Sequence, residues 1–146
     1  MHYLIIMVKS MKIVALDVGD RWTGIAISDS LGMFARPYKT VSAIVLPEEL
    51  AAIITAEAIN TVVVGLPKTL RGTESEQTLK IKAYVELLKN KFPKVTWIFW
   101  DERMTSKQAE SIKKIKNKED KLQSHAIAAA LVLGSYLDYL EFQKRF

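Results

Sequence analysis

Residues 11–29 read MKIVALDVGDRWTGIAISD and contain two apolar runs separated by a short polar loop. Residues 13–17 and 24–29 have the length and composition of β-strands, and the loop between them predicts a hairpin. The first strand ends in Asp17, a charge at a position where a strand is normally buried. Such a charge is costly unless it is paired or binds a metal ion. Asp17 therefore either caps the loop by hydrogen bonds, as an Asp after a strand often does, or has a chemical role.

The rest of the chain alternates strands and helices. The expected elements are, in chain order, a strand at 34–41, a helix at 46–59, a strand at 61–66, a helix at 74–90, a strand at 95–100 and a closing helix at 123–142. Pro37 makes the third strand irregular or an edge strand. In the second helix, the residues expected to face the core are Leu79, Ala83, Leu87 and Leu88. This order predicts an α/β fold class, a mixed five-stranded sheet of three antiparallel strands followed by αβαβ, with helices on both faces.

The composition is that of an ordinary globular protein with a basic surplus. The 146 residues include 21 Lys and Arg against 16 Asp and Glu, a net charge of +5, and the length suits one domain at 11–146. The absence of cysteine excludes disulfides, thiolate metal sites and cysteine nucleophiles, and is consistent with a cytoplasmic location. Residues 1–10 are apolar but too short to span a bilayer, so no membrane partner is expected. They are interpreted as a leader from an upstream start codon or as an extra edge strand.

Polar groups also follow the other apolar runs. Gly65-Leu66-Pro67 and Asp101-Glu102-Arg103 each end a predicted strand, and Ser124-His125 open the closing helix. Because functional groups in open α/β sheets gather at strand ends, these segments and Asp17 predict one site. The segment 107–121 is rich in lysine. It is either a solvated loop or a surface that binds phosphates. Beside a carboxylate cluster, a phosphate-binding role is favoured.

Four segments, in order and at matching separations, resemble the signature motifs of the YqgF/RuvX family. They are Leu16 to Arg21 with Gly24 to Asp29, Val63 to Pro67 with Gly72 and Gln77, Asp101 to Ser106 with Ala109, and Ala128 to Leu137. The resemblance runs from Met11 to Leu137, nearly the whole chain. It implies a ribonuclease H-like fold and a nuclease that either matures the 5′ end of pre-16S ribosomal RNA or resolves Holliday junctions.

The carboxylates at the predicted strand ends are the type of side chain that metal-dependent phosphodiester hydrolysis requires. Two divalent cations about 4 Å apart can activate water and stabilise the leaving oxygen. Hard oxygen ligands suit Mg²⁺ or Mn²⁺. Asp17 is predicted to bridge both ions, since a central strand fixes its position. The second carboxylate is expected from Asp101 or Glu102; the family resemblance favours Glu102, because strand alternation alone does not decide between neighbours.

The third catalytic position departs from the family pattern. Aligning Ser135 to Leu137 with the family's closing helix places His125 where most members have an aspartate. We interpret His125 as the third metal ligand, which would favour Mn²⁺ over Mg²⁺, or as an acceptor of the proton of water. The alternatives are that His125 is a helix cap or packing residue, that Asp120 replaces the missing acid, or that the site has lost activity.

Basic residues near these acids are predicted to bind nucleic acid. They are Arg21, Arg103, Lys107, Lys113, Lys114, Lys116 and Lys118. For the two arginines, ion pairing with a neighbouring acid is an equal alternative. Asp29 is expected to fix the hairpin rather than bind metal. The expected partner is structured RNA such as pre-rRNA, or branched DNA, and the protein is a monomer or a homodimer; junction cleavage needs two active sites and favours the dimer.

Two other classes of protein compete with this interpretation. ATPase domains of the actin and sugar-kinase type share D-x-G before a hairpin, but they need well over twice this length. The segment from Gly65 to Gly72 also has no Gly-Lys-Ser/Thr of a P-loop. A non-catalytic nucleic-acid-binding protein that lost the metal site through His125 is the second competitor, and it would bind without metal-dependent cleavage.

Overall fold

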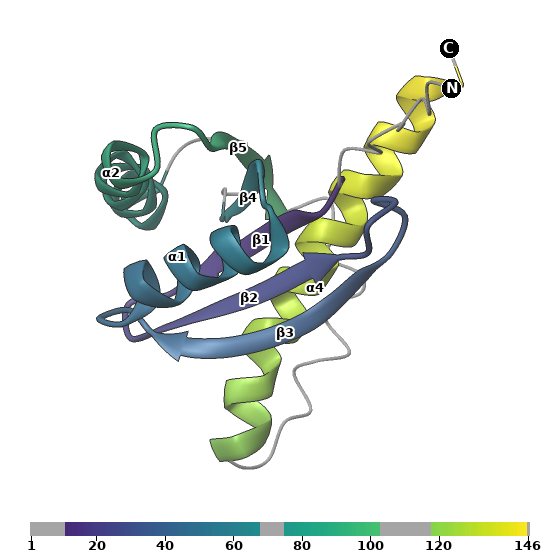
Figure 1. Cartoon of the computed structure of the whole chain (residues 1–146). Helices are drawn as coiled ribbons and strands as arrows, with labels where there is room; N and C mark the ends of the chain where they lie inside the picture. The colour runs from purple at the N-terminus through teal and green to yellow at the C-terminus, as the bar shows by residue number, and fades with distance from the viewer. Residues whose placement is uncertain (1–10, 68–74, 103–117, 146) are drawn as a thin grey trace.

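Within the described residues, the strands form a mixed sheet in the order β3-β2-β1-β4-β5 (Figure 1). The computed structural model describes residues 11–67, 75–102 and 118–145. The strands are β1 (Ile13–Val18), β2 (Trp22–Ser28), β3 (Ala35–Ser42), β4 (Thr61–Leu66) and β5 (Thr96–Asp101), and the helices are α1 (Leu46–Glu57), α2 (Glu76–Lys91) and α4 (Lys118–Lys144). The predicted elements are all present, with the largest boundary difference at the start of α4.

The strand directions confirm the predicted fold class. β1 pairs antiparallel with β2, and β2 pairs antiparallel with β3. β1 also pairs parallel with β4, and β4 pairs parallel with β5. Since β1, β4 and β5 run in the same direction, their carboxyl ends meet at one edge of the sheet. This edge brings Asp17 near the residues that follow β4 and β5.

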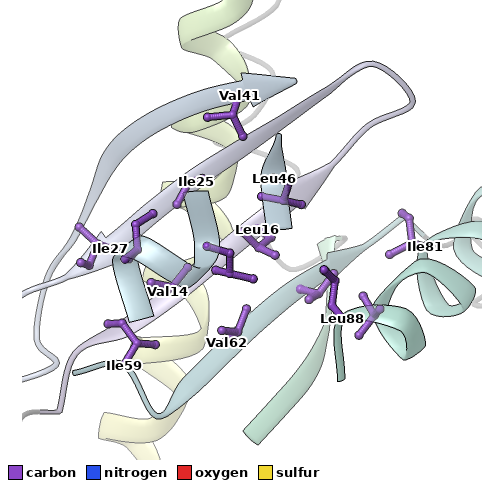
Figure 2. Packing of buried hydrophobic residues seen from close by; sticks show 14 of the residues in the cluster. Val14, Leu16, Ile25, Ile27, Val41, Leu46, Ile59, Val62, Ile81 and Leu88 are labelled. Atoms are coloured by element: carbon purple, nitrogen blue, oxygen red, sulfur yellow. The ribbon is translucent and has the colours of Figure 1, made fainter. Parts of the chain in front are cut away.

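Alternate side chains of each strand face two separate layers. One face of the sheet packs against α1 and α2, and Figure 2 shows Val14, Leu16 and Val62 of β1 and β4 pointing into this layer beside Leu88 of α2. Its buried residues are Val14, Leu16, Ile25, Ile27, Val41, Leu46, Leu50, Ile53, Ile59, Val62, Val64, Leu66, Ile81, Val85 and Leu88. Burial of such side chains contributes about 1.5–3 kcal/mol each, so this layer is the larger source of stability.

The other face of the sheet is covered by α4 (Figure 1). The strands present small side chains here, including the fully buried Ala15 and Ala26. Helix α4 packs against these strands with a buried stripe formed by Ala129, Val132, Leu133, Tyr136 and Leu137. Small residues on the sheet let the helix axis lie close, which sets the height of α4 above the carboxyl end of β1.

The edge strand β3 behaves as Pro37 predicts. β3 is the outer strand of the sheet, and its register against β2 shifts between Ile25 and Ala26. Pro37 has no backbone N–H to donate, which an edge strand and an irregular register both tolerate. Asp29 fixes the β2–β3 turn as expected, because its Oδ1 accepts hydrogen bonds from the N–H groups of Met33 and Phe34, both at 2.8 Å.

The predicted inward face of α2 is wrong for three of its four residues, since Leu79, Ala83 and Leu87 are all exposed. Leu79 and Leu87 are 55% and 65% exposed, and the buried positions are Thr78, Ile81, Val85 and Leu88. Ser75 Oγ caps the helix by accepting from the N–H of Thr78, and the Thr78 hydroxyl donates to the carbonyl of Pro67. These bonds hold Thr78 in a buried position, and the neighbouring Leu79 faces the solvent.

Two further expectations concern the membrane and the first ten residues. In the described ranges, no helix combines the length and apolarity that crossing a membrane requires. The interpretation of residues 1–10 as a leader or an extra strand lies outside the described residues.

Candidate active site

Asp17 lies near the carboxyl end of β1 on the face covered by α4. Ile13 and Ala15, which alternate with it along β1, both pack in the α4 layer, so the side chain of Asp17 points to the same face. Its side chain is 22% exposed, and its backbone pairs with Gly24 of β2. A half-buried carboxylate on an inner strand is held rigidly, as a metal-binding or reacting group requires.

Glu102 directly follows β5 and reaches the same face. Trp100 and Ile98, two and four residues earlier, pack in the α4 layer, so alternation continues to Glu102 and directs Asp101 to the other side. A Cβ added at Gly65 of β4 would lie 2.7 Å from Glu102 Oε1. Glu102 therefore lies directly over Gly65, and an added Cβ there would force the carboxyl group of Glu102 to shift.

Trp100 links the end of β5 to α4. Its Nε1–H donates to Ser135 Oγ at 3.1 Å, and its ring meets Tyr136 edge to face with centroids 5.3 Å apart. Both contacts come from the middle of α4. They fix the position of β5 against the helix, and so the position of Glu102 beside Asp17.

The two carboxyl groups interact strongly. The pKa of Glu102 is raised from 4.5 to about 8, first by burial and then by the charge of Asp17, a hydrogen bond to Asp17 and the charge of Asp101. At neutral pH Glu102 is therefore mostly protonated and shares its proton with Asp17. Such a pair of acids, held together against their repulsion, is typical of a functional site.

His125 faces Asp17 from α4. Its Nδ1 lies 3.8 Å from Asp17 Oδ2, beyond hydrogen-bond distance, and its side chain is 34% exposed. Gly24 makes this approach possible, because a Cβ there would lie 1.9 Å from the carbonyl oxygen of His125. Gly19, in the β1–β2 turn, lies on the other side, with the position of its absent Cβ 3.9 Å from His125 Cε1.

The structure thus brings together Asp17, Glu102 and His125, and Asp101 lies close enough for its charge to raise the pKa of Glu102. Arg21 is exposed in the β1–β2 turn, where its carbonyl accepts from the N–H of Ala43 at 3.0 Å. Lys118 and Asp120 lie in the first turn of α4. Their side chains, with Arg103, Lys107, Lys113, Lys114 and Lys116, lie outside the described part of the chain, so the roles predicted for them stay predictions.

Sequence reasoning assigned no role to Gly24 and Gly65. Both interrupt otherwise β-branched or apolar strands, and a glycine inside a strand often marks the close approach of another group. That signal was available in the sequence. Only the structure shows that Gly24 receives the backbone of α4 and that Gly65 receives Glu102.

The donor set fits a divalent cation in part. Among the described residues, no three His, Asp or Glu side chains are arranged as a complete set of metal ligands. Asp17 and Glu102, however, are hydrogen-bonded oxygen donors whose shared proton neutralises a buried charge. A hard divalent cation could replace this proton and remove the repulsion. The pair therefore suits one ion, with His125 beside it as a nitrogen donor or a proton acceptor.

Comparison with known proteins shows which family the chain is similar to. A family model described as "RuvX: Holliday junction resolvase" matches residues 11–139. The chain belongs to the RuvX family. Similar RuvX relatives include a "Putative pre-16S rRNA nuclease" of Sulfurihydrogenibium, 39% identical over 136 residues that cover 90% of this chain and 92% of the relative. A relative of the same name in Rubrobacter xylanophilus is 34% identical over 128 residues, covering 87% and 92%.

Solved structures support the expected fold of this RuvX family member. The RuvC protein of T. thermophilus in complex with a Holliday junction substrate superposes with a TM-score of 0.59 at 13% identity, covering 90% of this chain and 96% of that chain. A second structure of Thermus thermophilus RuvC gives a TM-score of 0.55 at 15% identity, covering 91% and 97%. The ribonuclease H-like fold predicted from the motifs is confirmed.

Proposed function

We propose that this protein is a divalent-cation-dependent nuclease that hydrolyses a phosphodiester bond during maturation of the 5′ end of pre-16S rRNA. The observation that supports this most directly is the carboxyl pair of Asp17 and Glu102 at the carboxyl edge of the sheet, with Glu102 held protonated by burial and by Asp17. The names of the relatives supply the substrate class.

The residues of the site have separate tasks in this proposal. Asp17 and Glu102 would hold Mg²⁺ or Mn²⁺, and Glu102 would bind the ion in its deprotonated form. The bound cation supplies the Lewis acid that phosphodiester hydrolysis needs. The His125 imidazole, 3.8 Å from Asp17, accepts a proton from the attacking water at Nδ1 or completes the ligand set. A second ion would need further ligands, for which Asp120 and Asp101 are the candidates.

Cleavage of Holliday junctions is the second candidate. The description of the family model and the fold shared with RuvC favour it. Cutting both strands of a junction requires two sites, so this function would make the protein a homodimer, whereas trimming an RNA end would not.

The test compares two substrates under the same conditions. A labelled pre-16S leader RNA and a four-way DNA junction are incubated with Mn²⁺, Mg²⁺ or chelator and the wild type, Asp17→Asn or His125→Ala. Glu86→Gln, which removes an exposed carboxylate of α2 paired with Lys89, is the matched control. We expect metal-dependent cutting of the RNA by the wild type and the control, and loss in Asp17→Asn.

Other outcomes would change the proposal. If only the DNA junction is cut, the protein would be assigned a function in DNA recombination instead of rRNA maturation. Binding of both substrates without any metal-dependent cutting would identify a binding protein on a nuclease fold.

A further inference from the structure

A small pocket lies on the far side of the β1–β2 turn from the carboxyl pair. It has a volume of about 180 Å³ and is lined by Val18 at the end of β1, by the turn residues Gly19 and Asp20, by Ala43 after β3, and by four residues of α2. Those four are Gln77, Lys80, Ile81 and Tyr84. Pockets that bind drug-sized ligands have volumes of about 300 Å³ or more, so this smaller pocket suits a single ring system.

The pocket has the chemistry of a nucleobase site. Its floor is apolar, formed by Val18, the buried Ile81 and the half-buried ring of Tyr84. Its polar lining residues are Gln77, whose amide can both donate and accept hydrogen bonds, Lys80 and Asp20. A flat ring with donors and acceptors on its edge matches this arrangement, whereas the negative charge of Asp20 opposes a phosphate at the same place.

Hydrogen bonds hold the walls of the pocket together. The N–H of Ala43 donates to the carbonyl of Arg21 at 3.0 Å, and the Tyr84 hydroxyl donates to the carbonyl of Ala43 at 3.4 Å. The N–H of Gly19 donates to the carbonyl of Trp22 at 2.9 Å. Three separate segments are thus joined before any ligand arrives, which lowers the cost of binding.

The pocket is next to the carboxyl pair. Val18 follows Asp17 in β1 and points to the opposite face, with Cα atoms about 3.8 Å apart. Gly19 belongs to both places, since it lines the pocket and lies close to the His125 ring. A nucleic acid that crosses the end of β1 with a phosphate at Asp17 therefore brings a neighbouring nucleotide to the pocket.

We infer that this pocket binds one unpaired nucleobase adjacent to the phosphate that is cleaved, and so selects substrates that are single-stranded or locally opened at the cleavage point. The inference rests on the proposed nuclease function for the position of the cleaved phosphate. A base in a duplex is stacked on both faces and paired along its edge, so it cannot enter a slot for one ring. The apolar floor supplies the stacking surface and Gln77 the contact with the edge of the base.

The first test does not depend on cleavage. Amide chemical shifts of the protein are recorded by NMR in chelator while AMP, GMP, CMP, UMP or ribose 5-phosphate is added. We expect nucleotides to shift the amides of Val18, Gly19, Ala43 and Gln77, and ribose 5-phosphate not to shift them. Gln77→Ala should weaken nucleotide affinity about fivefold, the loss expected for one hydrogen bond. Asn90→Ala, an exposed amide at the other end of α2, is the matched control and should change nothing.

The possible results separate this inference from the proposed function. Equal shifts with ribose 5-phosphate, or nucleotide shifts that avoid these residues, would overturn the nucleobase site even if the protein cuts RNA. Nucleotide binding in the pocket of a protein that cuts nothing would keep the base site and refute the nuclease. Where cutting is observed, an abasic nucleotide beside the cleaved phosphate should reduce RNA affinity in the wild type and have little further effect in Gln77→Ala.

Discussion

Replacing Glu102 by glutamine should stabilise the metal-free protein at alkaline pH. Protonated Glu102 is hydrogen-bonded to Asp17 in the fold, and the glutamine amide can donate to Asp17 in the same way at every pH. The wild type loses its proton as the pH rises, and two carboxylates then face each other. The variant does not.

The size and sign follow from the pKa of Glu102, which rises from 4.5 to about 8 in the fold. A raised pKa means that the folded state binds the proton more tightly, so its contribution is complete below about pH 4.5 and is lost as the pH rises to about 8. Each pKa unit corresponds to about 1.4 kcal/mol, which sets an upper limit of roughly 5 kcal/mol. Solvent still reaches the pair, Asp17 being 22% exposed, so we expect about 2–3 kcal/mol.

The measurement is urea unfolding followed by circular dichroism in chelator, at pH 5 and pH 8.5. Wild type and Glu102→Gln should have similar free energies of unfolding at pH 5, and the variant should be more stable at pH 8.5. Adding Mn²⁺ at pH 8.5 should stabilise the wild type and not the variant, because a cation takes the place of the proton. A difference between the two proteins that is the same at both pH values would show that Glu102 does not titrate against Asp17.

Three further predictions concern the same site. Asp17→Asn should abolish cleavage while leaving RNA binding nearly intact in a gel-shift assay, since the lysines are unchanged; equal activity would remove Asp17 from the site. Gly24→Ala should lower the free energy of unfolding by about 1–3 kcal/mol in urea titrations and reduce cleavage, because the new methyl group would meet the backbone of His125. An unaltered stability would mean that α4 does not press on β2 there. RNA affinity should fall steeply with salt in titrations between about 50 and 200 mM, because lysines neutralise phosphates; a flat response would exclude the segment 107–121 as the contact surface.

The sheet was predictable because its strands have unambiguous patterns. The β-branched run of β4 can only be buried on both faces, and it lies in the interior of the sheet. Asp17 was identifiable as a charge that interrupts an apolar strand. These features depend on one element at a time, which is what sequence patterns report.

Features that depend on two elements were harder to predict. The inward face of α2 was misassigned because leucine spacing was read without the bonds that Ser75 and Thr78 make around the start of the helix. Whether Asp101 or Glu102 lies beside Asp17 could be decided only once it was known which side of β5 faces α4. The raised pKa of Glu102 needed its burial and its contact with Asp17, residues 85 positions apart in the numbering.

Calorimetric titration with Mn²⁺ at pH 7 tests most directly whether Asp17 and Glu102 form a cation site for hydrolysis. Repeating the titration in buffers of different ionisation enthalpy also measures the protons released. The wild type should bind Mn²⁺ and release close to one proton per ion, because Glu102, with a pKa of about 8, is mostly protonated before the ion arrives. Asp17→Asn should not bind. Equal binding by this variant, or binding by the wild type without proton release, would contradict the assignment of the carboxyl pair as the centre of the site.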